Sequence, residues 1–241
     1  MGKIEKDNVY DLLRSLLGND HEVNILQEEV DVNTQLAYFD HVHLKGRALL
    51  PGEIVEVEKT LSKENLILAD IKDMLVCLAL TPEVKAYRIL ERFVGNSEGE
   101  IRCWAIMAFQ ENKVHLETSL GDQPHSLISS GMGGVGHRLR YFVVMLPALE
   151  PDFSLKQKEF LQKEVKYCLE GDDSQMEEIK FYDGFACLSV LIPLNVALPD
   201  LFHRIIDSCN LFGNFLSEKM IITNVKRLDE VEVRDIIAKG M

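Results

Sequence analysis

Apolar residues recur at helical spacing from about Asn8 to Leu120, whereas strand-like apolar runs begin at His137. The change in period falls within residues 129–136, where four of the six residues from Gly131 onward are glycine. One kind of architecture ends there and another begins. The pattern predicts a helical first half and a second half that mixes strands with helices.

The first half divides into several amphipathic helices. Asp7 or Asn8 can cap a first helix, and a second pattern covers about residues 33–44. Pro51 and Pro82 each open a later helix at its first position, where the missing N–H of proline costs nothing. The apolar face of the first helix consists of Val9, Leu12, Leu13, Leu16 and Leu17.

Two later helices of this half align at an offset of 30 residues. Each aligned helix has an acidic, aliphatic, basic start followed by large apolar residues on one face. The aligned positions are Asp70 with Glu100, Ile71 with Ile101, Lys72 with Arg102, Met74 with Trp104, and Leu78 with Ala108. The pattern resembles HEAT-type repeats over about residues 51–118, and this resemblance implies antiparallel helix pairs stacked into a curved array.

The second half reads as strand, helix, strand, strand, helix, strand. The strands are expected at about residues 137–146, 176–182, 185–192 and 219–225, with a hairpin turn at Asp183-Gly184. Asp152 or Ser154 caps the first helix, Pro199 opens the second, and a short helix follows at about 231–238. This order resembles the ferredoxin-like split βαβ arrangement, a fold that hosts many unrelated functions.

The predicted fold is therefore a helical HEAT-like region followed by a small ferredoxin-like α+β domain. We expect the helical region at residues 1–120, a glycine-rich connecting loop at 121–136 and the α+β domain at 137–241. Residues 113–126 are open to two interpretations, because residues 114–120 either extend the preceding helix or start a strand. Whether residues 1–50 belong to the array is also open.

Charge and cysteine usage narrow the class of protein. The net charge of −13, from 26 Lys and Arg against 39 Asp and Glu, argues against binding to nucleic acid or to an anionic membrane surface. The longest apolar run, residues 185–198, is too short to span a bilayer and contains Pro193. Five widely spaced cysteines and no export signal favour a cytoplasmic protein with reduced thiols.

The glycine-rich segment is the one candidate ligand site. Gly131-x-Gly133-x-x-Gly136 matches the dinucleotide-binding fingerprint as a string, but a strand follows it where that motif needs a helix. A structural loop is therefore favoured. The alternative is an anion-binding nest in which backbone N–H groups act with arginines on one face of the next strand. Its residues are Gly131, Gly133, Gly134, Gly136, His137, Arg138 and Arg140, although both arginines could instead face solvent or pair with acidic side chains.

Other candidate chemistry is weak. His41 and His43 point to opposite sides of a helix, whereas zinc-binding helices use positions i and i+4. Ser129 and Ser130 lack the Gly-x-Ser-x-Gly elbow of a nucleophilic serine. We therefore expect no catalytic residue, no metal and no cofactor.

The leading hypothesis is a non-catalytic scaffold or protein-binding protein, because stacked helical hairpins expose surfaces that bind proteins and peptides. The net negative charge of the chain favours a partner with a basic segment. The alternative is a binding protein or enzyme for an anionic small molecule, phosphate or nucleotide, at the glycine-rich segment. A third possibility is a structural subunit of a homo-oligomer joined through an exposed edge of the second-half sheet.

Overall fold

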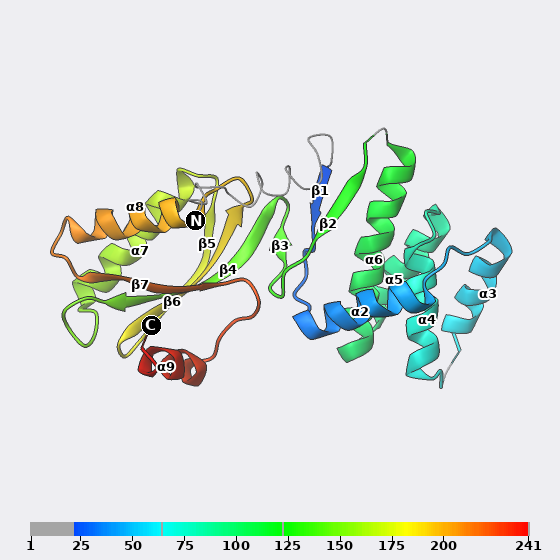
Figure 1. The fold of residues 1–241 in the computed structure, drawn as a ribbon, viewed down its shortest axis with the longest axis horizontal. Helices are drawn as coiled ribbons and strands as arrows, with labels where there is room; N and C mark the ends of the chain where they lie inside the picture. Colours follow the sequence, from blue (N-terminus) through cyan, green and yellow to red (C-terminus); the bar gives the residue numbers. More distant parts are fainter. Residues whose placement is uncertain (1–21, 64, 122, 241) are drawn as a thin grey trace, which may run out of the picture. The chain divides into compact units, whose positions relative to one another are not determined.

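The computed structural model describes residues 22–63, 65–121 and 123–240 as a mixed α+β protein (Figure 1). Their contacts divide the described chain into two compact units, residues 22–130 and 131–240. The helix expected at residues 8–17 lies outside the described residues. We call the two parts the helical unit and the sheet unit.

The helical unit contains five helices and one short strand pair within the described residues. Its elements are β1 (Glu22–Ile25), α2 (Val32–Lys45), α3 (Pro51–Leu61), α4 (Leu68–Ala79), α5 (Val84–Asn96), α6 (Gly99–Leu120) and β2 (His125–Ile128). Asp31 caps α2 by accepting the N–H of Thr34 at 2.9 Å, and Pro51 opens α3 as predicted. Pro82 lies outside α5, whose N-cap is Glu83, so its predicted role at the first helical position is wrong.

Strands β1 and β2 form a parallel pair in which Glu22 lies opposite His125 and Ile25 lies opposite Ile128. No pattern in the sequence predicted strand β1. Residues 114–120 could either extend the preceding helix or start a strand. In the structure they belong to helix α6, and strand β2 begins at His125. The pair thus joins segments about one hundred residues apart in sequence.

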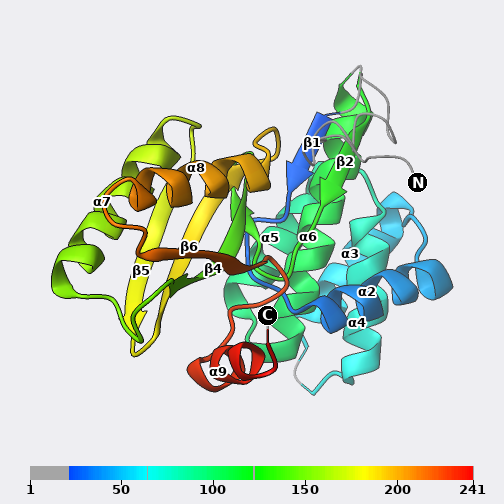
Figure 2. The same ribbon diagram turned by 60° about the vertical axis from the view of Figure 1, so that its left-hand side comes forward.

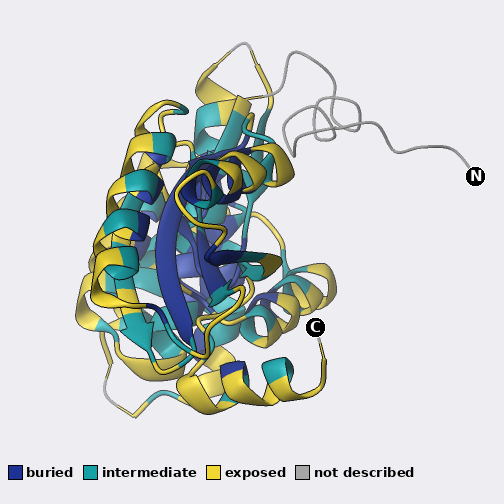
Figure 3. Cartoon of the chain, turned by 90° about the vertical axis from the view of Figure 1, so that its left-hand side faces the viewer, coloured by how far each residue is buried: buried dark blue, intermediate teal, exposed yellow. Residues whose placement is uncertain are grey.

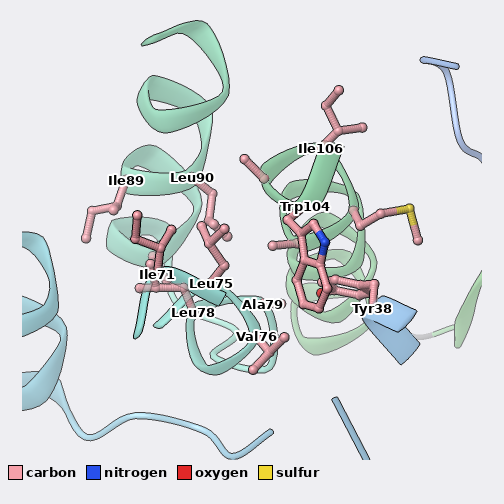
Figure 4. Close-up of a cluster of buried hydrophobic side chains, with 14 of the residues drawn as sticks. Tyr38, Ile71, Leu75, Val76, Leu78, Ala79, Ile89, Leu90, Trp104 and Ile106 are labelled. Atoms are coloured by element: carbon pink, nitrogen blue, oxygen red, sulfur yellow. The ribbon is translucent and has the colours of Figure 1, made fainter. Parts of the chain in front are cut away.

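Buried side chains of α2, α4, α5 and α6 form the core of the helical unit (Figure 4). The Trp104 ring meets the Tyr38 ring edge to face, with 5.6 Å between the ring centroids. Tyr38 donates a hydrogen bond of 2.5 Å to Glu111, and burial raises the pKa of that carboxyl. The apolar members of the cluster include Leu75, Val76, Leu78, Ala79, Leu90, Ile106 and Met107.

The sheet unit has four long antiparallel strands in the order β7-β4-β6-β5, with β3 beside the first residues of β4. Helices α7 and α8 cover one face and α9 covers the other (Figures 1 and 2). The elements are β3 (Gly134–Val135), β4 (Arg138–Pro147), α7 (Leu155–Glu170), β5 (Gln175–Tyr182), β6 (Phe185–Pro193), α8 (Leu198–Asn210), β7 (Leu216–Thr223) and α9 (Glu230–Ala238).

Strand β6 is buried along its whole length, as its continuous apolar run predicts (Figure 3). On the α9 side, Val233 packs with alternate residues of β4 and β6 such as Val144 and Cys187. The outer strands β5 and β7 each carry a register shift against their neighbour, at Met176/Glu178 and opposite Met145/Pro147. Such bulges interrupt the edge at which another strand would pair.

Candidate functional site

The glycine-rich segment forms a short hairpin with β4. Gly134 pairs with Leu139 and Val135 pairs with Arg138, so Gly136 and His137 make the turn between the two strands. Gly136 has a φ of 62°, a left-handed conformation that glycine adopts at low cost. A strand follows the glycines, as the sequence predicts, so the segment does not open a helix.

Gly131 lies against the backbone that follows β7. A Cβ atom on Gly131 would stand 1.7 Å from the carbonyl oxygen of Val225. The N–H of Met132 donates to the carbonyl of Asn224 at 3.1 Å, and the Met132 side chain is buried in the cluster beneath α9. The first glycine therefore permits a close backbone contact that anchors Met132.

His137 and Arg138 both reach Asp173, in the turn between α7 and β5. The Nε of Arg138 donates to the Asp173 carbonyl at 2.6 Å, and its Nη2 donates to the carboxylate. The Nε2 of His137 lies 3.0 Å from the other carboxylate oxygen. The hydrogen bonds from Arg138 and His137 hold the pKa of the Asp173 carboxyl below its usual value, so the carboxylate stays charged.

Arg140 is held by a second carboxylate on β5. Its Nε and Nη2 donate to the two oxygens of Glu177 at 2.7 and 2.9 Å, a bidentate geometry. Its Nη1 donates to the Met132 carbonyl at 2.8 Å, so the same guanidinium fastens the glycine-rich segment to the sheet. Glu177 also accepts the Ser189 hydroxyl at 2.9 Å, and the Arg140 hydrogen bonds lower the pKa of the Glu177 carboxyl.

The candidate residues thus lie together, but carboxylates already engage both arginines. Arg138 and Arg140 share one face of β4, as strand alternation predicts. Acidic partners for these arginines were among the alternatives considered from the sequence, but the sequence did not identify which residues they are. Asp173 and Glu177 could not be located in advance, because Glu177 occupies a bulge between Met176 and Glu178 that no residue pattern reveals.

Replacing Arg140 with alanine should destabilise the sheet unit by about 2 kcal/mol, whereas Arg138→Ala should cost less than about 1 kcal/mol. The reason is exposure, because the Arg140 and Glu177 side chains are 14% and 27% exposed and Asp173 is 64% exposed. Urea unfolding of both variants followed by circular dichroism measures the difference.

The Arg140 effect should also depend on pH. Because the folded-state pKa of Glu177 is lowered, the contribution of the pair is present at neutral pH and is lost as the pH falls through that pKa. Equal losses for the two variants, or a loss for Arg140→Ala that grows on acidification, would contradict the structural role of the pair.

The other side chains considered as candidate sites have contacts or burial that fit a structural role. His41 on α2 lies 2.6 Å from an Asp73 oxygen and meets the Trp104 ring edge to face. Within the described chain, no group of three His, Cys, Asp or Glu side chains is arranged to hold a metal ion. Burial raises the pKa of Cys187 to about 11 and that of Cys209 to about 12, which keeps both thiols protonated at neutral pH.

A groove of about 550 Å³ lies beside the first turns of α3 in the helical unit. Leu50, 70% exposed, and Val57 give it an apolar lining next to two carboxylates, those of Glu53 and Glu56. Arg47 binds Glu53 with two hydrogen bonds of 3.0 and 2.7 Å, and these lower the pKa of Glu53 to about 2. We call this surface, lined by Arg47, Leu49, Leu50, Gly52, Glu53, Glu56 and Val57, the α3 groove.

None of the helices in the described ranges is both long and apolar enough to cross a bilayer. No protein-family model matches the chain, and no curated protein matches it. A function for this chain is therefore inferred from its own contacts.

Proposed function

We propose that this chain is a non-catalytic protein-binding protein whose helical unit receives a basic, partly apolar segment of a partner. The observation that carries this proposal is the α3 groove, where the exposed Leu50 side chain lies next to the exposed carboxylate of Glu56, while Arg47 already binds the carboxylate of Glu53. An apolar contact beside anionic groups suits a segment that combines apolar side chains with lysine or arginine.

The distribution of charge supports this partner chemistry. Residues 22–130 hold 18 Asp and Glu against 10 Lys and Arg, whereas residues 131–241 hold 17 against 13. Most of the net negative charge of the chain therefore belongs to the helical unit. A negative field of this kind steers a basic partner toward the surface and speeds its association.

A repeat architecture of the helical unit is part of the proposal. We infer that α3 with α4 and α5 with α6 are two stacked hairpins of a HEAT-like array. In support, Glu58 on α3 pairs with Lys85 and Arg92 on α5, and Lys72 on α4 pairs with Glu100 on α6. Corresponding helices of the two hairpins thus contact each other, as stacked repeats require.

For the sheet unit we propose the ferredoxin-like arrangement. The strand order β7-β4-β6-β5, with antiparallel neighbours and two crossover helices, fits a split βαβ unit repeated once. This arrangement leaves the function open. We also propose a cytoplasmic location, where the five free thiols would remain reduced.

The rival function, an anion site at Gly131, Gly133, Gly134, Gly136, His137, Arg138 and Arg140, has less support. An anion there would compete with Asp173 for Arg138 and with Glu177 for Arg140. It would also face the charge of both carboxylates.

The proposal is tested by recovering partners from the source cell with three forms of the intact protein. These are the wild type, a groove variant carrying Leu50→Ser and Glu56→Lys, and a control carrying Leu44→Ser and Asp40→Lys on the exposed side of α2. A partner recovered by the wild type and the control should fall at least about tenfold with the groove variant, and binding of the purified partner should weaken with salt. Equal recovery by all three forms would exclude the α3 groove as the binding surface.

A further inference from the structure

A second groove, outside the α3 groove and the glycine-rich segment, lies between α8 and β7 of the sheet unit, which run beside each other in Figures 1 and 2. Its volume is about 580 Å³, within the range of roughly 300–1,000 Å³ typical of small-molecule sites. The lining residues are Tyr141, Leu198, Pro199, Phe202, His203, Met220, Ile222, Thr223 and Asn224. We call it the α8–β7 groove.

The lining of this groove is mostly apolar and carries no Lys, Arg, Asp or Glu side chain among the described residues. Its accessible apolar side chains are Leu198 and Pro199 on α8 and Met220 and Ile222 on β7, whereas Phe202 is fully buried beneath them. His203, on the exposed side of α8, is the single titratable imidazole in the lining. A charged ligand would lose its hydration here without gaining an ionic partner from a lysine, arginine or carboxylate, so the lining favours a neutral occupant.

Tyr141 gives the groove a hydrogen-bond donor. It lies on β4 one residue before Phe142, which faces α9, so its side chain lies on the opposite face of the sheet with α8. Tyr141 is 6% exposed, and no hydrogen-bond partner for its hydroxyl occurs in the described chain. Burial raises the pKa of Tyr141 to about 12, so the hydroxyl remains protonated at neutral pH.

The Tyr141 hydroxyl is not among the fully buried side-chain atoms that lack a partner, so it is reached from the groove, where a ligand can supply the acceptor. We propose that the α8–β7 groove binds a neutral, mainly apolar small molecule whose carbonyl-type oxygen accepts a hydrogen bond from Tyr141. The apolar body of the ligand would lie against Leu198, Met220 and Ile222. This site is independent of the protein-binding role proposed above.

The first test is a fluorescence titration with Nile red, a neutral apolar dye that carries a ring carbonyl. The wild-type chain should bind it saturably at one site. Tyr141→Phe removes only the hydroxyl and should weaken binding roughly three- to tenfold, the effect of one hydrogen bond. Met220→Trp should fill the groove and abolish saturable binding, with circular dichroism reporting that each variant is folded.

Two controls test whether the dye occupies this groove. Tyr167→Phe makes the same change at a tyrosine that is 74% exposed on α7, and it should leave the affinity unchanged. Leu211→Ser with Phe212→Ser removes the exposed apolar side chains that follow α8, and it should also have no effect.

Three results would overturn the proposal. They are the absence of saturable binding, an unchanged affinity in Tyr141→Phe, and loss of binding in the Leu211 and Phe212 double variant.

Discussion

Replacing Gly131 with alanine is expected to destabilise the sheet unit by more than about 3 kcal/mol, enough to unfold it in a marginally stable protein. The added Cβ would stand 1.7 Å from the Val225 carbonyl oxygen and 2.7 Å from the carbonyl carbon. Both are backbone atoms, so no side-chain rotation relieves the clash. The segments must separate, which breaks the Met132 to Asn224 hydrogen bond and withdraws Met132 from its buried site.

Two other glycines are matched controls. Alanine at Gly95 in α5 meets nothing within 4 Å and should stabilise the helical unit by up to about 1 kcal/mol, because alanine has the higher helix propensity. Gly136 also has open space, but its φ of 62° should make alanine there cost roughly 1–2 kcal/mol. Hydrogen exchange of β4 and β7 measures the Gly131 and Gly136 variants, and urea unfolding followed by Trp104 fluorescence measures the Gly95 variant.

The outcome at Gly131 bears on the function of the glycine-rich segment. If the segment served mainly to hold phosphate, its contact with Val225 would matter little for stability, and Gly131→Ala would cost the sheet unit little. If Gly131→Ala retained the stability of the wild type, the close approach to Val225 would not anchor the segment, and the anion-binding interpretation would regain weight. A large loss of stability means that the first glycine serves packing.

The predicted elements that agree with the structure have a local physical cause. Ser154 caps α7 and exchanges hydrogen bonds with Gln157, a capping box that can be identified in the sequence. The turn at Asp183-Gly184 joins β5 to β6 because glycine readily adopts the φ of 88° found at Gly184. In both cases residues within four positions of each other determine the conformation.

The features that could not be predicted depend on partners far away in sequence. Strand β1 exists by pairing with β2, and its four residues carry no period of their own. Gly134 and Val135 count as a strand because β4 folds back against them. Strand β7 begins at Leu216, three residues before the expected Lys219. Residues 217–219 form a bulge opposite Leu146, and pairing with β4 resumes beyond it, between Leu216 and Pro147.

In the candidate sites, too, the local features could be predicted from the sequence and the contacts with distant residues could not. Strand alternation predicts that Arg138 and Arg140 share a face, but the carboxylates that bind them come from residues 35 and 37 positions later. The α8–β7 groove is still less accessible to sequence reasoning. Tyr141 belongs to an apolar strand in which a tyrosine is an ordinary core residue, and only the fold shows its hydroxyl without a partner in the described chain.

Asn112→Ala is expected to destabilise the helical unit by about 2 kcal/mol. The sequence places Asn112 in an amphipathic helix, where an asparagine is usually exposed, yet the side chain is fully buried. Its amide donates to the carbonyls of Leu78 and Thr81 at 2.8 and 2.6 Å, at the end of α4. Alanine would remove both hydrogen bonds, each worth about 0.5–1.5 kcal/mol, and would leave a cavity where the amide was buried. The backbone N–H groups of Thr81 and Glu83 would still donate to the Leu78 and Thr81 carbonyls.

Thr81, which accepts a hydrogen bond from Asn112, is itself hydrogen-bonded to α4 and to the residue that precedes α3. Its hydroxyl donates to the Cys77 carbonyl at 2.7 Å and accepts the N–H of Leu49 at 2.9 Å, just before α3. Asn112 on α6 therefore holds the end of α4 in the position that also fixes the start of α3 and of the α3 groove. Loss of the amide should loosen that groove as well as lower the stability of the unit.

Urea unfolding followed by the fluorescence of Trp104 measures this effect, because the single tryptophan of the chain lies in the core of the helical unit. Asn96→Ala, at an exposed asparagine ending α5, should change the free energy of unfolding by less than about 0.5 kcal/mol. Asn112→Asp keeps the shape but replaces the amide donors with an acceptor, so at neutral pH it should lose at least as much stability as alanine. A loss below about 1 kcal/mol in both Asn112 variants would mean that water replaces the amide at these carbonyls, and that α6 does not hold the end of α4.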